Sequence, residues 1–179
     1  MKGLKEFIIQ FVGLKDGEHH FDFDIGNAFF QNFEYEEFNE VSVKTNLKLI
    51  KKPTLLELFF TVSGDVNLNC DITNEPFNQP IEDDFKLVVK FGSEYNDDNE
   101  DILIIPHGEY QVNITQYIYE LIVLAVPTKR VHPGIEDGTL KSDILLKLEE
   151  LSPKENNEKN TSEDIDPRWH NLKKLLTDK

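Results

Sequence analysis

The stretch that decides the fold is Leu56-Glu-Leu-Phe-Phe-Thr-Val-Ser-Gly-Asp-Val-Asn-Leu-Asn-Cys70-Asp71. Apolar side chains occupy every second position, and the positions between them are mostly polar. Because successive side chains of a strand point to opposite faces, this alternation predicts a long antiparallel strand with one face on a core and one in water. Gly64 takes an apolar position in mid-run, which indicates a bulge, a bend or the close approach of another backbone.

The same alternation recurs on both sides of this run. It predicts further strands over residues 7–11, 21–25, 41–49, 85–91 and 101–105. A turn signal at 15–17 indicates that the first two strands are joined by a short connection, with His19 and His20 flanking a hairpin turn. The acidic run over residues 94–101 is expected to form a solvated loop.

The apolar spacing changes to a helical period after residue 113. From Ile114 onward, apolar residues follow the spacing i, i+3, i+4, i+7 and i+8, which predicts a helix with one apolar face. Asn113 is placed to cap this helix, and Gln116, three residues on, is placed to form the hydrogen bond back to the cap residue. Pro127 is expected to end it, because proline cannot continue the hydrogen-bond ladder.

Three shorter helices are expected elsewhere. One lies within residues 27–38, where Asn27 is a candidate cap, and another covers residues 142–151. The third begins at Asp166-Pro167-Arg168-Trp169, because Asp is a good N-cap and Pro is favoured in the first turn. Together these elements predict an α+β fold: an antiparallel sheet or a partly open barrel, with helices packed on one side and a short C-terminal helix.

Charge is distributed unevenly along the 179 residues, which carry 34 acidic and 19 basic side chains and a formal net charge of -15. Residues 153–179 hold six of each sign, so the excess lies in residues 1–152. We expect a domain over 1–152, a polar linker over 153–165 and the terminal helix over 166–179. Such a charge argues against a protein that wraps DNA or RNA, since phosphate binding relies on clustered Lys and Arg. No apolar stretch has the length of a membrane span or signal peptide, so we expect a cytoplasmic protein without membrane contacts.

The chain contains no recognised catalytic or cofactor motif. A nucleophile elbow, a phosphate loop, a dinucleotide fingerprint and a zinc-protease motif are all absent, so we expect neither an enzyme nor a cofactor. The lone cysteine, Cys70, excludes an internal disulfide, and its place on the apolar parity favours a buried side chain over a reactive thiol. The run 94–101 lacks the spacing of a calcium loop. Asp22 and Asp24 are expected to lie on a solvated strand face.

Trp169 is the only tryptophan and falls in the first turn of the predicted terminal helix. Its chemistry favours an anchor that docks this helix onto the sheet. The alternative is an exposed anchor for a partner protein or for a nucleobase.

Three stretches, taken in order, resemble the YceD-like family, the large-ribosomal-RNA-subunit accumulation proteins of bacteria and plastids. They are Val62-Ser-Gly64-Asp-Val66-Asn-Leu68-Asn-Cys70-Asp71-Ile-Thr73-Asn-Glu75-Pro76, then Glu120-Leu-Ile-Val-Leu-Ala-Val-Pro127, then Asp166-Pro167-Arg168-Trp169. The signature positions that the resemblance marks are Gly64, Cys70, Asp71, Thr73, Glu75, Pro76, Glu120, Pro127, Asp166, Pro167, Arg168 and Trp169. This chain departs from the family at Ile72, where Arg is usual, and at Asn74, where Leu is usual. Many relatives carry a second Cys at the position of Thr73. It also has no cysteine in 128–138, where many relatives have several, so no metal site is expected.

The resemblance implies a role in 23S rRNA accumulation, and hence in large-subunit biogenesis, without a known catalytic reaction. An acidic main domain suits a basic partner, so we expect the chain to bind a basic ribosomal protein or a pre-50S particle, and not DNA. The alternative is direct binding of rRNA through local basic groups, namely Lys129, Arg130, Lys173 and Lys174. A remote alternative is a hydrolase that acts on rRNA.

Overall fold

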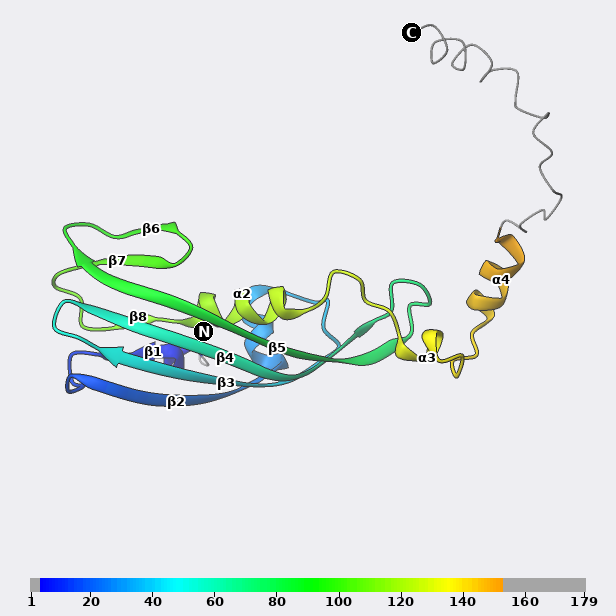
Figure 1. The fold of residues 1–179 in the computed structure, drawn as a ribbon, viewed down its shortest axis with the longest axis horizontal. Coiled ribbons are helices and arrows are strands. Elements are labelled where there is room, and N and C mark those ends of the chain that lie inside the picture. Colours follow the sequence, from blue (N-terminus) through cyan, green and yellow to red (C-terminus); the bar gives the residue numbers. More distant parts are fainter. Residues whose placement is uncertain (1–3, 153–179) are drawn as a thin grey trace, which may run out of the picture. The chain divides into compact units, whose positions relative to one another are not determined.

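The computed structural model describes residues 4–152 (Figure 1). The chain divides into two compact units, Met1–Lys141 and Ser142–Lys179, and each is considered by itself. The predicted linker and terminal helix lie outside the described residues. Six predicted site residues therefore lie there too, namely Asp166, Pro167, Arg168, Trp169, Lys173 and Lys174.

Residues 4–141 of the first unit contain eight strands and five helical segments, and residues 142–152 of the second unit contain one further helix. The strands are β1 (Ile8–Ile9), β2 (Gly17–Gly26), β3 (Glu40–Lys51), β4 (Leu55–Asn69), β5 (Pro76–Gly92), β6 (Asn96–Asn99), β7 (Ile102–Pro106) and β8 (Val112–Asn113). The helical segments are η1 (Lys5–Phe7), α1 (Asn27–Phe30), η2 (Gln31–Phe33), α2 (Thr115–Ala125), α3 (Pro133–Glu136) and α4 (Asp143–Leu151). Among residues 4–152, no helix is long and apolar enough to span a membrane.

Six strands form one open sheet in the order β2-β3-β4-β5-β7-β6, and β1 pairs with β8 in a small second sheet. Strands β2 to β5 are antiparallel neighbours, β7 lies parallel to β5, and β6 lies antiparallel to β7. The predicted α+β class is confirmed, and of the two predicted forms the chain adopts the open sheet. Its two edge strands are β2 and β6.

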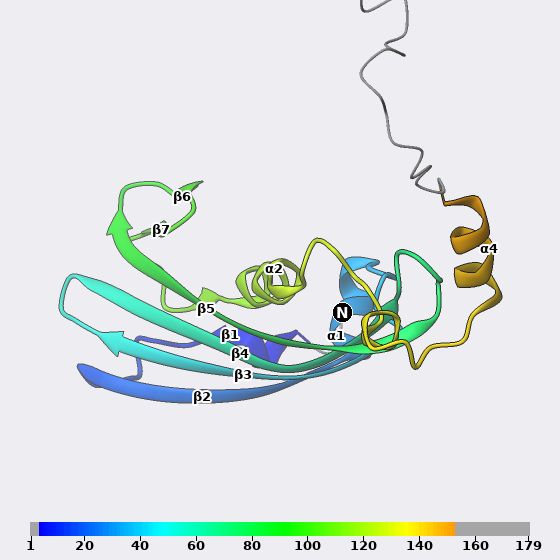
Figure 2. The same ribbon diagram turned by 45° about the vertical axis from the view of Figure 1, so that its right-hand side comes forward.

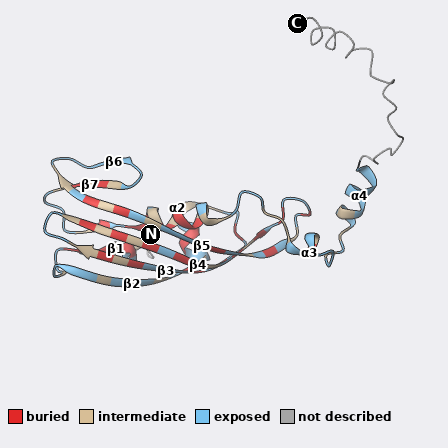
Figure 3. Cartoon of the chain, viewed as in Figure 1, coloured by how far each residue is buried: buried red, intermediate tan, exposed pale blue. Residues whose placement is uncertain are grey.

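The core lies on one face of this sheet. Buried and exposed residues alternate along β3 and β4 (Figure 3), and the deciding stretch buries Leu56, Leu58 and Phe60 almost completely. Helices α1 and α2 lie on the same side of the sheet (Figure 2), and Phe29, Phe30, Ile118 and Ile122 join its core. The predictions of strands over 41–49 and 56–70, of a helix after Asn113 and of a helix over 142–151 are confirmed.

Gly64 marks a close approach between two strands, which is one of the three predicted possibilities. Its φ is +154°, a conformation that side chains rarely adopt. A Cβ built on it would lie 2.7 Å from Cα of Val43 on β3, and closer still to the carbonyl oxygen of Ser42. Only glycine therefore fits this position without moving β3.

Three local predictions are wrong. Residues 7–11 form no hairpin with 21–25, because β1 has two residues and pairs with β8, and His19 and His20 lie inside β2. The short helix predicted within 27–38 is confirmed and ends at Phe33, but the cap predicted for it is wrong. Asn27 caps nothing, because its side chain accepts from Val41 N at 2.7 Å and donates to Asn39 O at 2.9 Å. The run 94–101 contains the exposed strand β6.

Candidate functional site

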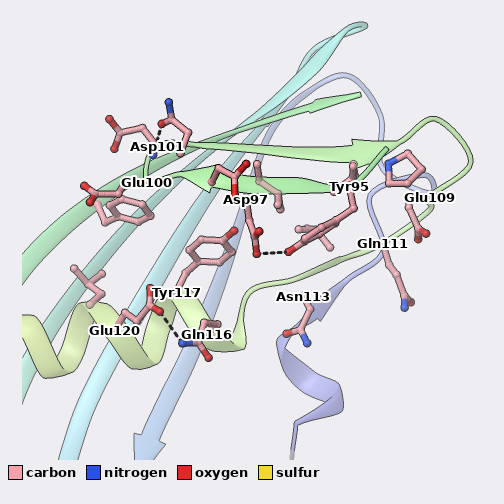
Figure 4. A pocket seen from close by; sticks show the side chains of 18 of the residues that line it. Tyr95, Asp97, Glu100, Asp101, Glu109, Gln111, Asn113, Gln116, Tyr117 and Glu120 are labelled. Atoms are coloured by element: carbon pink, nitrogen blue, oxygen red, sulfur yellow. Dashed lines mark hydrogen bonds between the residues drawn. The ribbon is translucent and has the colours of Figure 1, made fainter. Parts of the chain in front are cut away.

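The first unit contains an acidic groove of about 970 Å³. It lies between the β6–β7 hairpin, the segment that leads from β7 to α2, and α2 itself (Figure 4). Six carboxylates line it, namely Asp97, Asp98, Glu100, Asp101, Glu109 and Glu120, together with Tyr95 and Tyr117. No lysine, arginine or histidine is among the lining residues.

Helix α2 supplies one wall of the acidic groove because its apolar stripe fixes its orientation. Ile118, Leu121 and Ile122 are buried against the sheet, which leaves Glu120 and Leu124 beside the groove. The helix start is held by Asn113, whose Oδ1 accepts from the backbone N of Thr115 at 2.9 Å and from its Oγ1 at 2.6 Å. Asn113 therefore acts at the helix start as predicted, although the N-cap residue is Ile114.

The predicted partner of this cap is different. The Gln116 side chain does not form the predicted hydrogen bond back to Asn113. Its Nε2 donates to Glu120 Oε1 at 2.6 Å, one helical turn further on. This bond holds the Glu120 carboxylate in place at the groove wall (Figure 4).

An aromatic stack forms the floor of the acidic groove. The Tyr117 ring lies 6.2 Å from the Phe85 ring at 15°, and 6.5 Å from the Phe60 ring at 27°. Phe60 is 1% exposed, so the stack is anchored in the core. Two large side chains remain open to solvent, with Tyr95 59% exposed and Leu124 77% exposed. Exposed apolar area beside carboxylates suits the aliphatic stem and charged head of a Lys or Arg side chain.

The acidic groove carries negative charge that no basic side chain of the described residues neutralises. Among residues 4–152, none of its six carboxylates forms an ion pair. Tyr95 donates its hydroxyl to Asp97 Oδ2 at 3.0 Å. Partial loss of solvation, and after it this carboxylate, raise the pKa of Tyr95. Burial, and after it the charges of Tyr95, Asp97 and Glu120, raise the pKa of Tyr117 to about 12. Both tyrosines therefore stay neutral at physiological pH and present ring faces that attract cations.

The acidic groove can hold cations but offers no evident catalytic set. Within the described residues, no group of three or more His, Cys, Asp and Glu side chains is arranged to hold a metal ion. The carboxylates come from β6, the turn after it, the segment before β8, and α2, so they line a surface instead of converging on one point. Such a surface fits an extended segment that carries several positive charges.

The signature residues at 70–76 lie elsewhere, in the turn from β4 to β5. Cys70 N donates to Glu75 O at 2.9 Å and Asn74 N donates to Cys70 O at 2.8 Å, with Asn74 at φ +58°. Thr73 is buried, and its Oγ1 accepts from Glu75 N at 3.4 Å. Pro76 is the first residue of β5. These contacts define a tight turn at the end of the β4–β5 hairpin.

This turn also holds the segment that follows α2. Asp71 N donates to Arg130 O, and Arg130 N donates to Asp71 Oδ2, both at 2.8 Å. The Arg130 guanidinium lies 2.7 Å from Glu37 Oε2 and 3.4 Å from Asp71 Oδ1. The hydrogen bond from Arg130 to Glu37, and then the charges of both carboxylates, raise the pKa of Arg130 despite some loss of solvation. Its charge is thus shared with two carboxylates of the same chain.

Cys70 is buried in this turn with 2% exposure. Its Sγ accepts from the backbone N of His132 at 3.3 Å and of Ile72 at 3.4 Å. Burial raises the pKa of the thiol and hydrogen bonds from Thr73, His132 and Ile72 lower it, with a balance below the ordinary value. The predicted preference for a buried Cys70 is confirmed.

The predicted site residues therefore fall into separate places. Gly64 lies in β4, Glu120 lines the acidic groove, and Pro127 follows the end of α2. Lys129 is exposed in the segment after α2. Most of the groove, including Tyr95 and Tyr117, is not predicted by the sequence pattern. The one available signal was the acidic run 94–101, which was expected to be a solvated loop only.

Comparison with known proteins gives one match. The family model of the large ribosomal RNA subunit accumulation protein YceD matches residues 58–176. No curated protein matches the chain, and no solved structure does. The matched region includes most of β4, all of β5 to β8, the Cys70 turn and α2, and hence the whole acidic groove. Because this region is well over half of the sequence, the chain belongs to the family of the large ribosomal RNA subunit accumulation protein YceD.

Proposed function

We propose that this protein is a non-catalytic factor in large-subunit biogenesis that binds a basic segment of a ribosomal protein in its acidic groove. The observation that carries the proposal is a groove lined by six carboxylates, two tyrosines and no basic side chain. Ribosomal proteins are among the most basic proteins of a cell, and their extended segments are rich in Lys and Arg. The factor would act in the cytoplasm, where it holds such a protein or docks on a nascent particle.

The physical basis is charge complementarity combined with exposed apolar area. Complementary potentials raise association rates and reject partners of like charge, and they add less to the final affinity. At about 0.15 M salt the Debye length is about 8 Å, so carboxylates that line one groove act together on an incoming cation. Tyr95, Tyr117 and Leu124 add surfaces on which guanidinium groups and Lys stems can pack.

Direct binding of RNA through Arg130 has less support. The Arg130 guanidinium is engaged by Glu37 and Asp71, so contact with phosphate would require those ion pairs to break. The hydrolase alternative also lacks support, since the acidic groove holds no convergent nucleophile and base.

The test measures binding of purified large-subunit ribosomal proteins to the full chain by calorimetry. A groove variant replaces one carboxylate on each of three segments: Asp97→Asn, Glu109→Gln and Glu120→Gln. Each exposed charge contributes about 0.2–1 kcal/mol, so we expect affinity for the cognate ribosomal protein to fall roughly tenfold.

The matched control removes the same charge from the opposite face of the sheet. It carries Asp24→Asn, Asp65→Asn and Glu82→Gln, three residues that are exposed on β2, β4 and β5. Full affinity in the control and reduced affinity in the groove variant support the proposal. An equal loss of affinity in both variants would show that binding depends only on the net charge of the protein, and it would contradict the proposal.

A further inference from the structure

The face of the sheet opposite the core carries lysines around an aromatic ring. Cross-strand pairing places Lys48 of β3, Phe59 of β4 and Lys86 of β5 side by side in one row. The Phe59 ring centroid lies 5.6 Å from Lys48 Nζ and 5.0 Å from Lys86 Nζ. Lys52 and Lys90 extend the row toward the β3–β4 hairpin. We call these four lysines and Phe59 the lysine patch.

The lysine patch is a local excess of positive charge. Its nearest carboxylates, Glu57 and Glu18, are paired with its lysines: Glu57 with Lys52 and Lys86, and Glu18 with Lys48 at 3.8 Å. Hydrogen bonds from Lys52 and Lys86 hold the pKa of Glu57 below its ordinary value. Four ammonium groups thus face two carboxylates, so the patch keeps two positive charges in excess even when these pairs form. Arg130 differs, because its single positive charge faces two carboxylates.

Acidic side chains on this face are concentrated further along the strands. They are Asp22, Asp24, Glu40, Asp65, Glu82 and Asp84, with Lys44 among them. The same face is therefore basic near the β3–β4 hairpin and acidic toward the other ends of these strands. A net charge of -15 on the whole chain does not prevent phosphate binding where basic groups are clustered in this way.

The lysine patch also contains apolar surface. Phe59, Ile50, Leu55 and Val88 are half-buried on a face that is otherwise polar. A ring that projects from a sheet among lysines offers a stacking surface for a base and ammonium groups for the adjoining phosphates. Two adjacent strand spacings and four residues of strand give the patch a size of about 10 by 13 Å.

We propose that the lysine patch binds single-stranded RNA, with a base stacked on Phe59 and the backbone phosphates held by Lys48, Lys86 and Lys90. Its size accommodates about two or three nucleotides. The patch lies on the face of the sheet opposite α2, so it is separate from the acidic groove and does not depend on the protein partner proposed above. A factor with both surfaces contacts RNA and a basic protein at the same time.

The experiment follows the fluorescence anisotropy of a labelled oligouridine of about ten nucleotides as the full chain is added. Phe59→Leu removes the stacking ring but keeps a half-buried apolar side chain. We expect it to weaken binding roughly tenfold and to leave the salt dependence unchanged. The double variant Lys48→Gln/Lys86→Gln touches no core residue. We expect it to lower the slope of log affinity against log salt by about 1.4, since each lost phosphate contact removes about 0.7.

The matched control is Lys44→Gln, on the same strand and the same face as Lys48 but outside the lysine patch. Binding equal to that of the wild type is expected for this variant. Three results would each overturn the proposal: no binding of oligouridine by the wild type at about 50 mM salt, a loss of affinity with Lys44→Gln as large as with Lys48→Gln/Lys86→Gln, or no effect of Phe59→Leu. Equal competition by polyglutamate would also overturn it, because the patch would then be a general anion surface. Thermal unfolding of each variant verifies that it is folded.

Discussion

Gly64 provides the sharpest test of the sheet, and Gly64→Ala is the perturbation. The residue has φ +154°, and its Cβ position lies 2.7 Å from Cα of Val43. Holding a non-glycine residue in such a conformation costs about 1–3 kcal/mol. Overpacking against a backbone that cannot move away costs about 1–3 kcal/mol more. Gly64→Ala should therefore lower the free energy of unfolding by about 2–6 kcal/mol, a large part of the stability of a typical domain.

The assay is urea unfolding of the full chain, followed by far-ultraviolet circular dichroism, which reports directly on the sheet. The midpoint concentration should fall strongly while the slope stays close to that of the wild type. Gly13→Ala is the control, because no atom outside its two chain neighbours lies within 4 Å of its Cβ position and its φ is not in the left-handed region. We expect the control to change stability by less than about 1 kcal/mol. A Gly64→Ala variant as stable as the Gly13→Ala variant would refute the close approach of β3 and β4.

Three further predictions concern single side chains. Thr45 is fully buried on β3 and, among the described residues, its Oγ1 has no hydrogen-bond partner. Thr45→Val should therefore raise the free energy of unfolding by about 1 kcal/mol in the same urea assay, and a loss of stability would contradict this. Folding raises the pKa of Tyr117 from 10.0 to about 12, so the stability that its neutral hydroxyl contributes is complete below about pH 10 and is lost as the pH rises through about 12. Over this pH range, Tm should therefore fall less steeply in Tyr117→Phe than in the wild type. The same Tm profile in both proteins would count against the burial of this hydroxyl. Arg130→Gln should lower the free energy of unfolding by about 0.5–1 kcal/mol, because it removes two ion pairs. Asp71→Ala should lower it more, because the backbone N–H of Arg130 then also loses its acceptor. The reverse order in urea unfolding would be evidence against these contacts.

The elements that the sequence predicted best are those whose one face is buried over many residues. β3, β4 and α2 have an uninterrupted period of burial, so the alternation or helical spacing directly reports which face meets the core. The sequence pattern does not predict which strands pair with one another. β1 pairs with β8, about a hundred residues away in sequence, and alternation within a strand does not identify its neighbour.

The outer half of β5 escaped prediction for a physical reason. Residues 76–84 contain two prolines and a run of three carboxylates, which interrupt any alternation. β7 pairs with β5 only from Val88 onward, so this half of β5 has a free edge. Proline is tolerated on a free edge because no neighbouring strand needs its missing N–H.

The acidic groove could be predicted only in part. Glu120 was singled out through its family motif, and the acidic run 94–101 was noted, but nothing in the sequence joined them. They meet because β7 lies parallel to β5, which places the β6–β7 hairpin beside α2. A parallel neighbour requires a crossover connection, and its position is decided by packing at long range. The lysine patch has the same origin, since Lys48, Phe59 and Lys86 adjoin only through strand register.

We propose that the acidic groove carries out the role of this family in the accumulation of large-subunit rRNA. The most direct measurement is the ratio of large- to small-subunit rRNA in cells whose own copy is replaced by the wild type, the groove variant or the opposite-face control. Protein abundance is matched by immunoblotting. We predict a normal ratio with the wild type and the control, and a reduced ratio with Asp97→Asn/Glu109→Gln/Glu120→Gln. A normal ratio with this groove variant at equal abundance would contradict the account.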